Sequence, residues 1–165
     1  MNSFVAAHAT RRGTLHLHAP PAHVFPLFTP EGEREWVPGW SPRYAWPPDG
    51  SVRIGTTFFT EHAGRATTWM VASHEPGVRV VYTRVTAGLN AVRVEVSCAP
   101  EGEGSAVTVR YDYVGLTPAG NESIEQVTQP RFAEWMREWE QSINTVLAAG
   151  SPADQERGFT QSQQS

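Results

Sequence analysis

Hydrophobic and polar residues alternate strictly over residues 106–114, as they do in a strand that is buried on one face. After a turn at residues 115–120, apolar residues recur at helical spacing as far as Leu147. Bulky, partly polar aromatic residues occur on both elements, which favours a pocket between them over a completely filled core. These aromatic residues are Tyr111, Tyr113, Phe132, Trp135 and Trp139.

The pattern before this junction predicts a strand, two short helices and a series of antiparallel strands. Residues 14–19 alternate as a half-buried strand, and the prolines that follow suit the first turn of a helix over residues 22–28. Residues 30–36 carry three glutamates that favour a helix N-terminus. Turn residues then separate predicted strands at 54–61, 67–74, 78–86, 91–99 and 106–114.

Prolines divide the rest of the chain. Four of them lie in residues 37–50, which predicts a loop or an edge strand around Tyr44 and Trp46. The C-terminal helix is expected over about residues 118–148, with Pro130 kinking or breaking it. The predicted organisation is a flexible N-terminus at 1–12, one domain at 13–149 and a disordered, Ser- and Gln-rich tail at 150–165.

Composition excludes several function classes. The chain of 165 residues has 39% hydrophobic and 18% charged residues, as expected for one globular domain. Its formal charge of −4 argues against nucleic acid or anionic lipid as a partner. All 13 basic residues are arginine, so no Schiff-base lysine exists. The chain has no signal-peptide pattern and no stretch near the ~20 apolar residues of a membrane span, so we expect a cytoplasmic protein.

Four segments resemble a known superfamily. Residues 15–25 (LHLHAPPAHVF) are similar to its first strand and short helix, and residues 33–40 (EREWVPGW) are similar to its second short helix and aromatic exit. Thr68 and Trp69 match a middle strand, and residues 113–121 (YVGLTPAGN) resemble its last strand as it enters the C-terminal helix. The chain thus resembles the START/polyketide cyclase-like (SRPBCC) superfamily from residue 14 to about residue 148.

The resemblance implies an α+β helix-grip fold, in which a curved antiparallel sheet of six or seven strands wraps around the long C-terminal helix. Members of this superfamily bind lipids, hormones or polyketides, cyclise or dehydrate them, or assist chaperones. Three functions therefore remain open. The first is binding of an apolar or aromatic, lipid- or polyketide-like molecule between sheet and helix; the second is a cyclase or dehydratase reaction; the third is a chaperone-activator-like interaction module. Oligomeric state is left open.

The largest ambiguity concerns the strand over residues 78–86. If Val80 faces the interior, Tyr82 and Arg84 do so as well, and Arg84 would then orient a carboxylate, phosphate or enolate. In the other register Val81, Thr83 and Val85 face inward and Arg84 faces water, and the strand pattern does not decide between the two. The residues predicted to contact a ligand are Trp46, Phe58, Trp69, Tyr82, Arg84, Tyr113, Trp135 and Trp139.

Other reactive residues favour structural interpretations. His16 and His18 share a strand face, but no further ligands follow at a recognisable spacing, so no metal is expected. Glu61 and His62 are expected at an exposed hairpin end, and the single cysteine, Cys98, as a buried thiol. Because no nucleotide, phosphate-loop or catalytic-serine motif is present, no cofactor is predicted.

Overall fold

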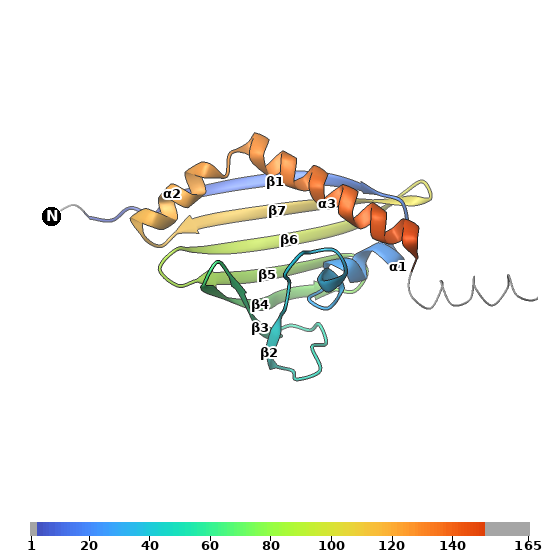
Figure 1. Cartoon of the computed structure of the whole chain (residues 1–165), viewed down its shortest axis with the longest axis horizontal. Helices are drawn as coiled ribbons and strands as arrows, with labels where there is room; N and C mark the ends of the chain where they lie inside the picture. Colours follow the sequence, from blue (N-terminus) through green and yellow to red (C-terminus); the bar gives the residue numbers. More distant parts are fainter. Residues whose placement is uncertain (1–2, 151–165) are drawn as a thin grey trace, which may run out of the picture.

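Seven antiparallel strands form one open sheet, and a long helix lies across one of its faces (Figure 1). The computed structural model describes residues 3–150. The strands are ordered β1-β7-β6-β5-β4-β3-β2. In chain order the elements are β1 (His8–Leu17), α1 (Pro21–Val24), η1 (Phe25–Phe28), η2 (Gly32–Glu35), β2 (Arg43–Trp46), β3 (Thr57–His62), β4 (Arg65–Glu75), β5 (Arg79–Thr86), β6 (Asn90–Glu101), β7 (Gly104–Gly115), α2 (Pro118–Gln126) and α3 (Gln129–Ala149).

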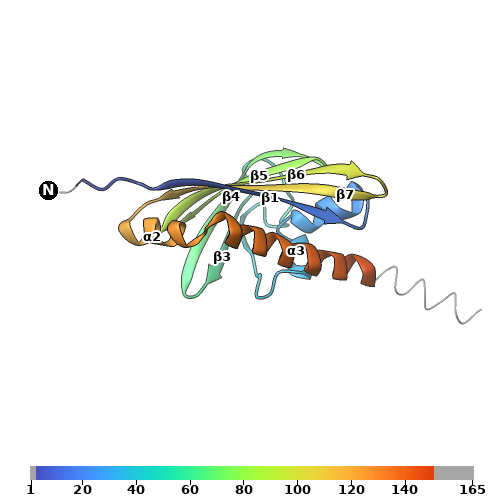
Figure 2. The same cartoon turned by 90° about the horizontal axis from the view of Figure 1, so that it is seen from above.

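The sheet curves toward the helix. Figure 2 shows α2 and α3 on one face, with β3 bending round to the same side. The prediction of an α+β helix-grip fold with two short helices after the first strand is therefore confirmed. Antiparallel sheets need one covered face, and here the inner face is covered by α3 and by the segment that contains η1 and η2.

Strand alternation separates an apolar inner face from a charged outer face. The inner side chains of β6 and β7, such as Val94, Val96 and Val109, are buried, and Cys98 is buried beside them as predicted. Outer side chains form ion pairs instead. These ion pairs include Arg79–Glu95 at 2.6 Å, Arg93–Glu95 at 2.9 Å and Arg110–Asp112 at 3.2 Å. Because β5 pairs with β6, the inner face of β6 also determines which side chains of β5 point to the interior.

The C-terminal segment that was expected as a kinked or broken helix forms two separate helices, α2 and α3, each with an N-cap. Thr117 Oγ1 accepts a hydrogen bond from the backbone N–H of Gly120 and caps α2, while Thr128 Oγ1 accepts one from Arg131 and caps α3. Pro130 stands in the first turn of α3, so the predicted break is confirmed. Within residues 3–150, no helix is both long and apolar enough to pass through a membrane.

Helix α3 is fastened to the edge strand β1 by polar side chains. Gln129 Nε2 donates to the carbonyl of Arg12 at 2.9 Å, Glu140 accepts from the N–H of His16 at 2.6 Å, and Asn144 accepts from the N–H of His18 at 2.9 Å. A glycine permits the close approach, since a Cβ on Gly13 would lie 2.6 Å from Cγ of Met136. The position of α3 over the sheet is thereby fixed.

The N-terminal prediction needs correction. The segment 1–12 was expected to be flexible, yet β1 begins at His8, which pairs with Val114, and Arg12 pairs with Arg110. Residues 8–12 lack clear apolar alternation, but β7 is long enough to supply a hydrogen-bonding partner for all of them. The predicted tail at 150–165 lies outside the described residues from residue 151 onward.

The two short helices are also tighter than predicted. The first is a single α-helical turn, α1, that continues as the 3₁₀ turn η1, and the second is reduced to the 3₁₀ turn η2. The turns η1 and η2 pack closely against each other at Gly32. A Cβ at this position would lie 1.8 Å from the carbonyl oxygen of Pro26. The loop after η2 then runs over the inner face of the sheet toward β2.

Candidate functional site

A cavity of about 290 Å³ lies between the η2 segment, the inner face of the sheet and α3. Five of its walls are aromatic, and two are carboxylates. A narrow extension of about 20 Å³ continues beneath it between Phe28, Phe58 and Tyr82. The residues that line the main cavity are Glu33, Trp36, Val37, Pro38, Trp40, Trp69, Tyr111, Glu138, Trp139 and Ser142.

Strand pairing builds the aromatic floor. Trp69 of β4 pairs with Phe58 of β3 on one side and with Arg84 of β5 on the other. The Phe58 and Trp69 rings stack with their centroids 5.6 Å apart, and Tyr82 meets both edge-on. Such offset and edge-to-face pairs hold aromatic rings in fixed orientations. The floor is therefore a rigid surface of ring faces and ring edges.

The opposite wall comes from α3 and the η2 segment. Trp139 of α3 meets the ring of Trp36 edge-on at 5.3 Å, and Trp40 meets Trp69 edge-on at 5.6 Å. Trp36 is buried and its Nε1 donates to the carbonyl of Leu27 at 2.7 Å, which ties η2 to η1. These contacts close the space between helix and sheet with indole rings.

Arg84 faces the interior, which resolves the ambiguity left by the sequence. Its guanidinium carbon lies 5.3 Å from the ring centroid of Trp69 and 5.9 Å from that of Tyr111. Its Nε is buried and has no hydrogen-bond acceptor among the described residues. Such a group is stabilised by ring faces, and a ligand oxygen would complete its hydrogen bonding.

Three tyrosines face the same interior with different hydrogen bonding. The Tyr82 hydroxyl donates to the carbonyl of Phe28 at 2.8 Å, so it is satisfied by the fold. The hydroxyls of Tyr111 and Tyr113 have no hydrogen-bond partner in the part of the chain that the structure describes. Burial raises the pKa of Tyr113 to about 12 and raises the pKa of Tyr111 as well, while the charge of Arg84 opposes both shifts. Both phenols are neutral at physiological pH.

Glu33 is the acidic group of the cavity. Its side chain is half-buried and, within residues 3–150, has neither an ion pair nor a hydrogen bond. Its neighbour Glu31 differs, because it accepts hydrogen bonds from Arg34 and from the Tyr44 hydroxyl, both at 2.8 Å. Burial among the aromatic walls raises the pKa of the Glu33 carboxyl well above its usual range.

This raised pKa predicts a stability change with a defined pH dependence. A carboxyl whose pKa is higher in the folded than in the unfolded state loses stability as pH rises from its unfolded pKa through its folded pKa. We therefore expect Glu33→Gln to raise the melting temperature at pH 7 and to leave it nearly unchanged at pH 4. Thermal unfolding at both pH values measures this, with exposed Glu35→Gln as the matched control. Equal shifts at both pH values would contradict the assignment.

Five of the predicted ligand-contacting residues come together at this cavity. Phe58, Trp69, Tyr82 and Trp139 line the main space or its extension, and Arg84 lies against the Trp69 ring. Tyr113 is buried on the same face of β7, two residues after Tyr111, with its ring centroid 5.7 Å from that of Tyr111. Which of these residues bind a ligand stays a prediction.

Two predicted residues lie elsewhere. Trp46 is 49% exposed on the edge strand β2 because a bulge between it and Tyr44 shifts the register, and Arg53 stacks on its ring at 4.6 Å. Trp135 lies one helical turn before Trp139, packs against Phe132, and carries Arg131 over its ring. Neither tryptophan is among the residues that line the aromatic cavity.

The cavity residues that were not selected from the sequence include Glu33, Trp36, Trp40 and Tyr111. Tyr113 was favoured over Tyr111 because it is nearer the helix junction, whereas Trp139 reaches over Tyr111, with ring centroids 6.4 Å apart. The available signal for the others was an acidic residue close to two tryptophans in a proline-rich segment.

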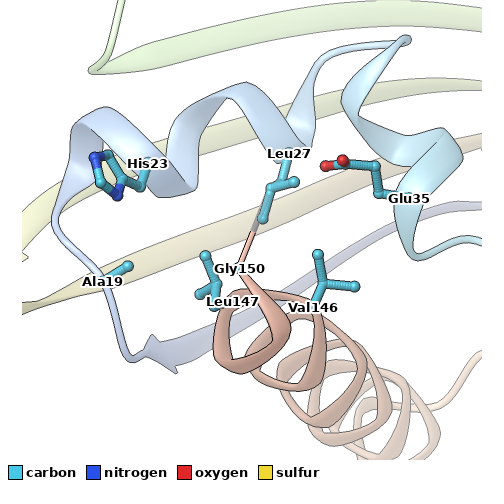
Figure 3. Close-up of a pocket in the computed structure, with 7 residues that line it drawn as sticks. All are labelled: Ala19, His23, Leu27, Glu35, Val146, Leu147 and Gly150. Atoms are coloured by element: carbon cyan, nitrogen blue, oxygen red, sulfur yellow. The ribbon is translucent and has the colours of Figure 1, made fainter. Parts of the chain in front are cut away.

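A second cavity of about 310 Å³ lies at the C-terminal end of α3 (Figure 3). His23 of α1 and Glu35 of η2 stand on opposite sides, with Leu27 between them and with Val146 and Leu147 of α3 below. It has no tryptophan or tyrosine wall, and both of its titratable side chains are exposed. The aromatic cavity is therefore the stronger candidate site. Among residues 3–150, no three His, Cys, Asp or Glu side chains gather as a metal site would require.

Comparisons with known proteins agree with this architecture. Residues 8–139 match the family described as polyketide cyclase/dehydrase and lipid transport. No curated protein matches the chain at a significant level. An uncharacterised protein from Rhizobium leguminosarum superposes with a TM-score of 0.63 at 21% identity, covering 86% of this chain and 98% of that chain.

Two further solved structures have the same fold at lower identity. DynU16, a protein in the dynemicin biosynthetic locus, gives a TM-score of 0.60 at 18% identity, covering 87% of this chain and 48% of its own. Truncated norcoclaurine synthase from Thalictrum flavum gives 0.62 at 12% identity, covering 89% of this chain and 98% of its own. At these identities the likeness concerns the fold alone.

Proposed function

Because the chain belongs to the polyketide cyclase/dehydrase and lipid transport family, we propose that it binds a small apolar or aromatic molecule between the sheet and α3. The observation that carries this proposal is the cavity of about 290 Å³ walled by Trp36, Trp40, Trp69, Tyr111 and Trp139. Ligand pockets in proteins are concave, mostly apolar and furnished with a few polar groups. This cavity has that character.

The size of the cavity narrows the ligand class. Its volume lies near the lower end of the range of about 300–1,000 Å³ that small-molecule pockets occupy. A compact molecule of one or two rings suits this space, whereas a lipid with two acyl chains exceeds it. The rigid ring contacts of the floor also oppose expansion.

Titration with compact and extended ligands tests the proposal. We expect isothermal titration calorimetry to detect binding of 2-naphthol, and native mass spectrometry to detect any molecule that copurifies. A diacyl phospholipid should bind much more weakly. Absence of binding by 2-naphthol and by every one- or two-ring compound in a broad panel would contradict the proposed function.

Arg84 supports catalysis as a second candidate function. Its guanidinium faces the interior beside Tyr111, and such a group stabilises the negative oxygen that develops when a carbonyl compound enolises. A cyclase- or dehydratase-type enzyme acting on a polyketide-like substrate would use it in this way. Product formation from a bound poly-β-ketone mimic, lost in Arg84→Gln, distinguishes this function from binding alone.

A further inference from the structure

The tryptophans of the cavity present ring faces and edges rather than hydrogen-bond donors. Nε1 of Trp36 donates to the carbonyl of Leu27, and Nε1 of Trp40 donates to that of Pro30, both at 2.7 Å. Nε1 of Trp69 donates to Thr60 Oγ1 at 2.9 Å. Three of the four indole N–H groups are thus committed to the fold. The indole walls therefore offer a ligand mainly π-electron surface.

The charged residues that line the cavity are acidic, while the Arg84 guanidinium lies against two of its walls, the rings of Trp69 and Tyr111. Glu33 and Glu138 both line it, and none of its lining residues is basic. Glu138 is exposed on α3, whereas Glu33 is half-buried and has no cation or hydrogen-bond donor within the described residues. A carboxylate removed from water without a partner is costly. A cationic ligand would supply the partner that the Glu33 side chain lacks within the described residues.

The aromatic walls of the cavity already contact one cation of the protein itself, the Arg84 guanidinium. Arg84 places a guanidinium 5.3 Å from the Trp69 centroid and 5.9 Å from the Tyr111 centroid, and its side chain has no carboxylate partner among residues 3–150. Ring faces attract cations through their negative electrostatic potential. Arg84 does not pair with Glu33, so the Glu33 carboxyl has no cationic partner among residues 3–150.

We propose that the ligand of this cavity is an organic cation, a quaternary or protonated amine on a compact apolar or aromatic body, with its charge between Glu33 and the indole rings. The proposal rests on the proposed binding function and specifies its ligand class. Cation–π attraction to several tryptophans and pairing with one carboxylate act on the same group of the ligand.

Two ligands of equal shape and different charge test this inference. Phenyltrimethylammonium carries a permanent positive charge, and tert-butylbenzene is its neutral isostere. We expect phenyltrimethylammonium to bind the full chain about tenfold more tightly. Equal or tighter binding of tert-butylbenzene overturns the charge inference while leaving cavity binding intact. If neither compound binds although 2-naphthol does, the charge inference is overturned. If 2-naphthol and the rest of the panel fail as well, the proposed function itself is contradicted.

Substitution of Glu33 tests whether its carboxylate is the group that pairs with the positive charge of the ligand. In Glu33→Gln the preference for phenyltrimethylammonium should largely disappear, while the affinity for tert-butylbenzene stays unchanged and shows that the cavity remains folded. Glu35→Gln, whose side chain lines the other cavity, should behave like the parent chain. A preference retained in Glu33→Gln overturns the assignment to this carboxylate.

The affinity for the cation should also rise with pH as Glu33 ionises. Tyr44, Tyr82 and Tyr111 interact electrostatically with Glu33. Glu31 and Arg34 lie beside Tyr44, Arg84 lies beside Tyr111, and Glu138 of α3 lines the same cavity as Glu33. Burial raises the pKa of each of these tyrosines and keeps it neutral. The variant Glu138→Gln is the control for ionisation of the exposed Glu138. A flat pH profile in the parent chain overturns the role of Glu33.

Discussion

Replacing Phe132 with alanine is expected to lower the free energy of unfolding by about 3–5 kcal/mol. Phe132 is fully buried, and its ring lies 5.4 Å from that of Tyr111 and 6.3 Å from that of Trp135. It is the first large apolar side chain of α3, so its loss leaves a void where the helix meets the sheet. Urea unfolding monitored by circular dichroism measures the change.

Phe4 provides the matched control, because the same substitution there removes a ring that is 48% exposed and should change stability far less. The urea m-value should stay constant in both variants if unfolding remains two-state. A loss below about 1 kcal/mol for Phe132→Ala would mean that α3 does not pack on β7 as described.

Replacing Trp139 with alanine is expected to weaken binding of 2-naphthol about tenfold or more. Trp139 lines both the main cavity and its narrow extension, and it holds the rings of Trp36 and Tyr111 in place. Truncation removes one wall and opens the space toward solvent. Calorimetric titration of the purified variant measures the change in the dissociation constant.

Trp135→Ala is the control for this variant. Trp135 lies on the same helix, one turn earlier, and it is half-buried outside the cavity. Its substitution should leave the dissociation constant within about twofold of the parent value. Equal losses in the two variants would show that binding depends on helix stability rather than on the cavity wall.

The order of strands and helices could be predicted from the sequence because most of the hydrophobic patterns fit only one type of element. Pro130 lies in the first turn of α3 and marks its separation from α2, and a threonine precedes each helix as an N-cap. Alternation of Val94 and Val96 with Glu95 fixed the inner face of β6. The sheet and its covering helix follow from such local signals.

The register of β5 was not accessible for a specific reason. Val80, Val81 and Tyr82 are all buried, so neither face of this strand is polar enough to mark the solvent side. Arg84 then faces inward because it pairs with Trp69 and Val92, whose side chains already point to the interior. Only the neighbouring strands determine its direction.

The cavity itself depends on distances that no local pattern encodes. Glu33 was interpreted as a residue of a helix N-terminus, but the 3₁₀ turn η2 sends Glu31, Glu33 and Glu35 in different directions. Tyr111 and Tyr113 share one face, and the choice between them is made by where Trp139 lies. These are properties of packing between distant segments.

The fastening of α3 to β1 has a consequence for association between molecules. An open sheet has two edge strands, and exposed edges are templates for pairing with other chains. Here the side chains of Gln129, Glu140 and Asn144 form hydrogen bonds with backbone groups along the β1 edge. The opposite edge strand, β2, has only four residues and a bulge. Both edges are therefore poor sites for strand addition, so the helix that forms one wall of the cavity also protects the sheet from aggregation.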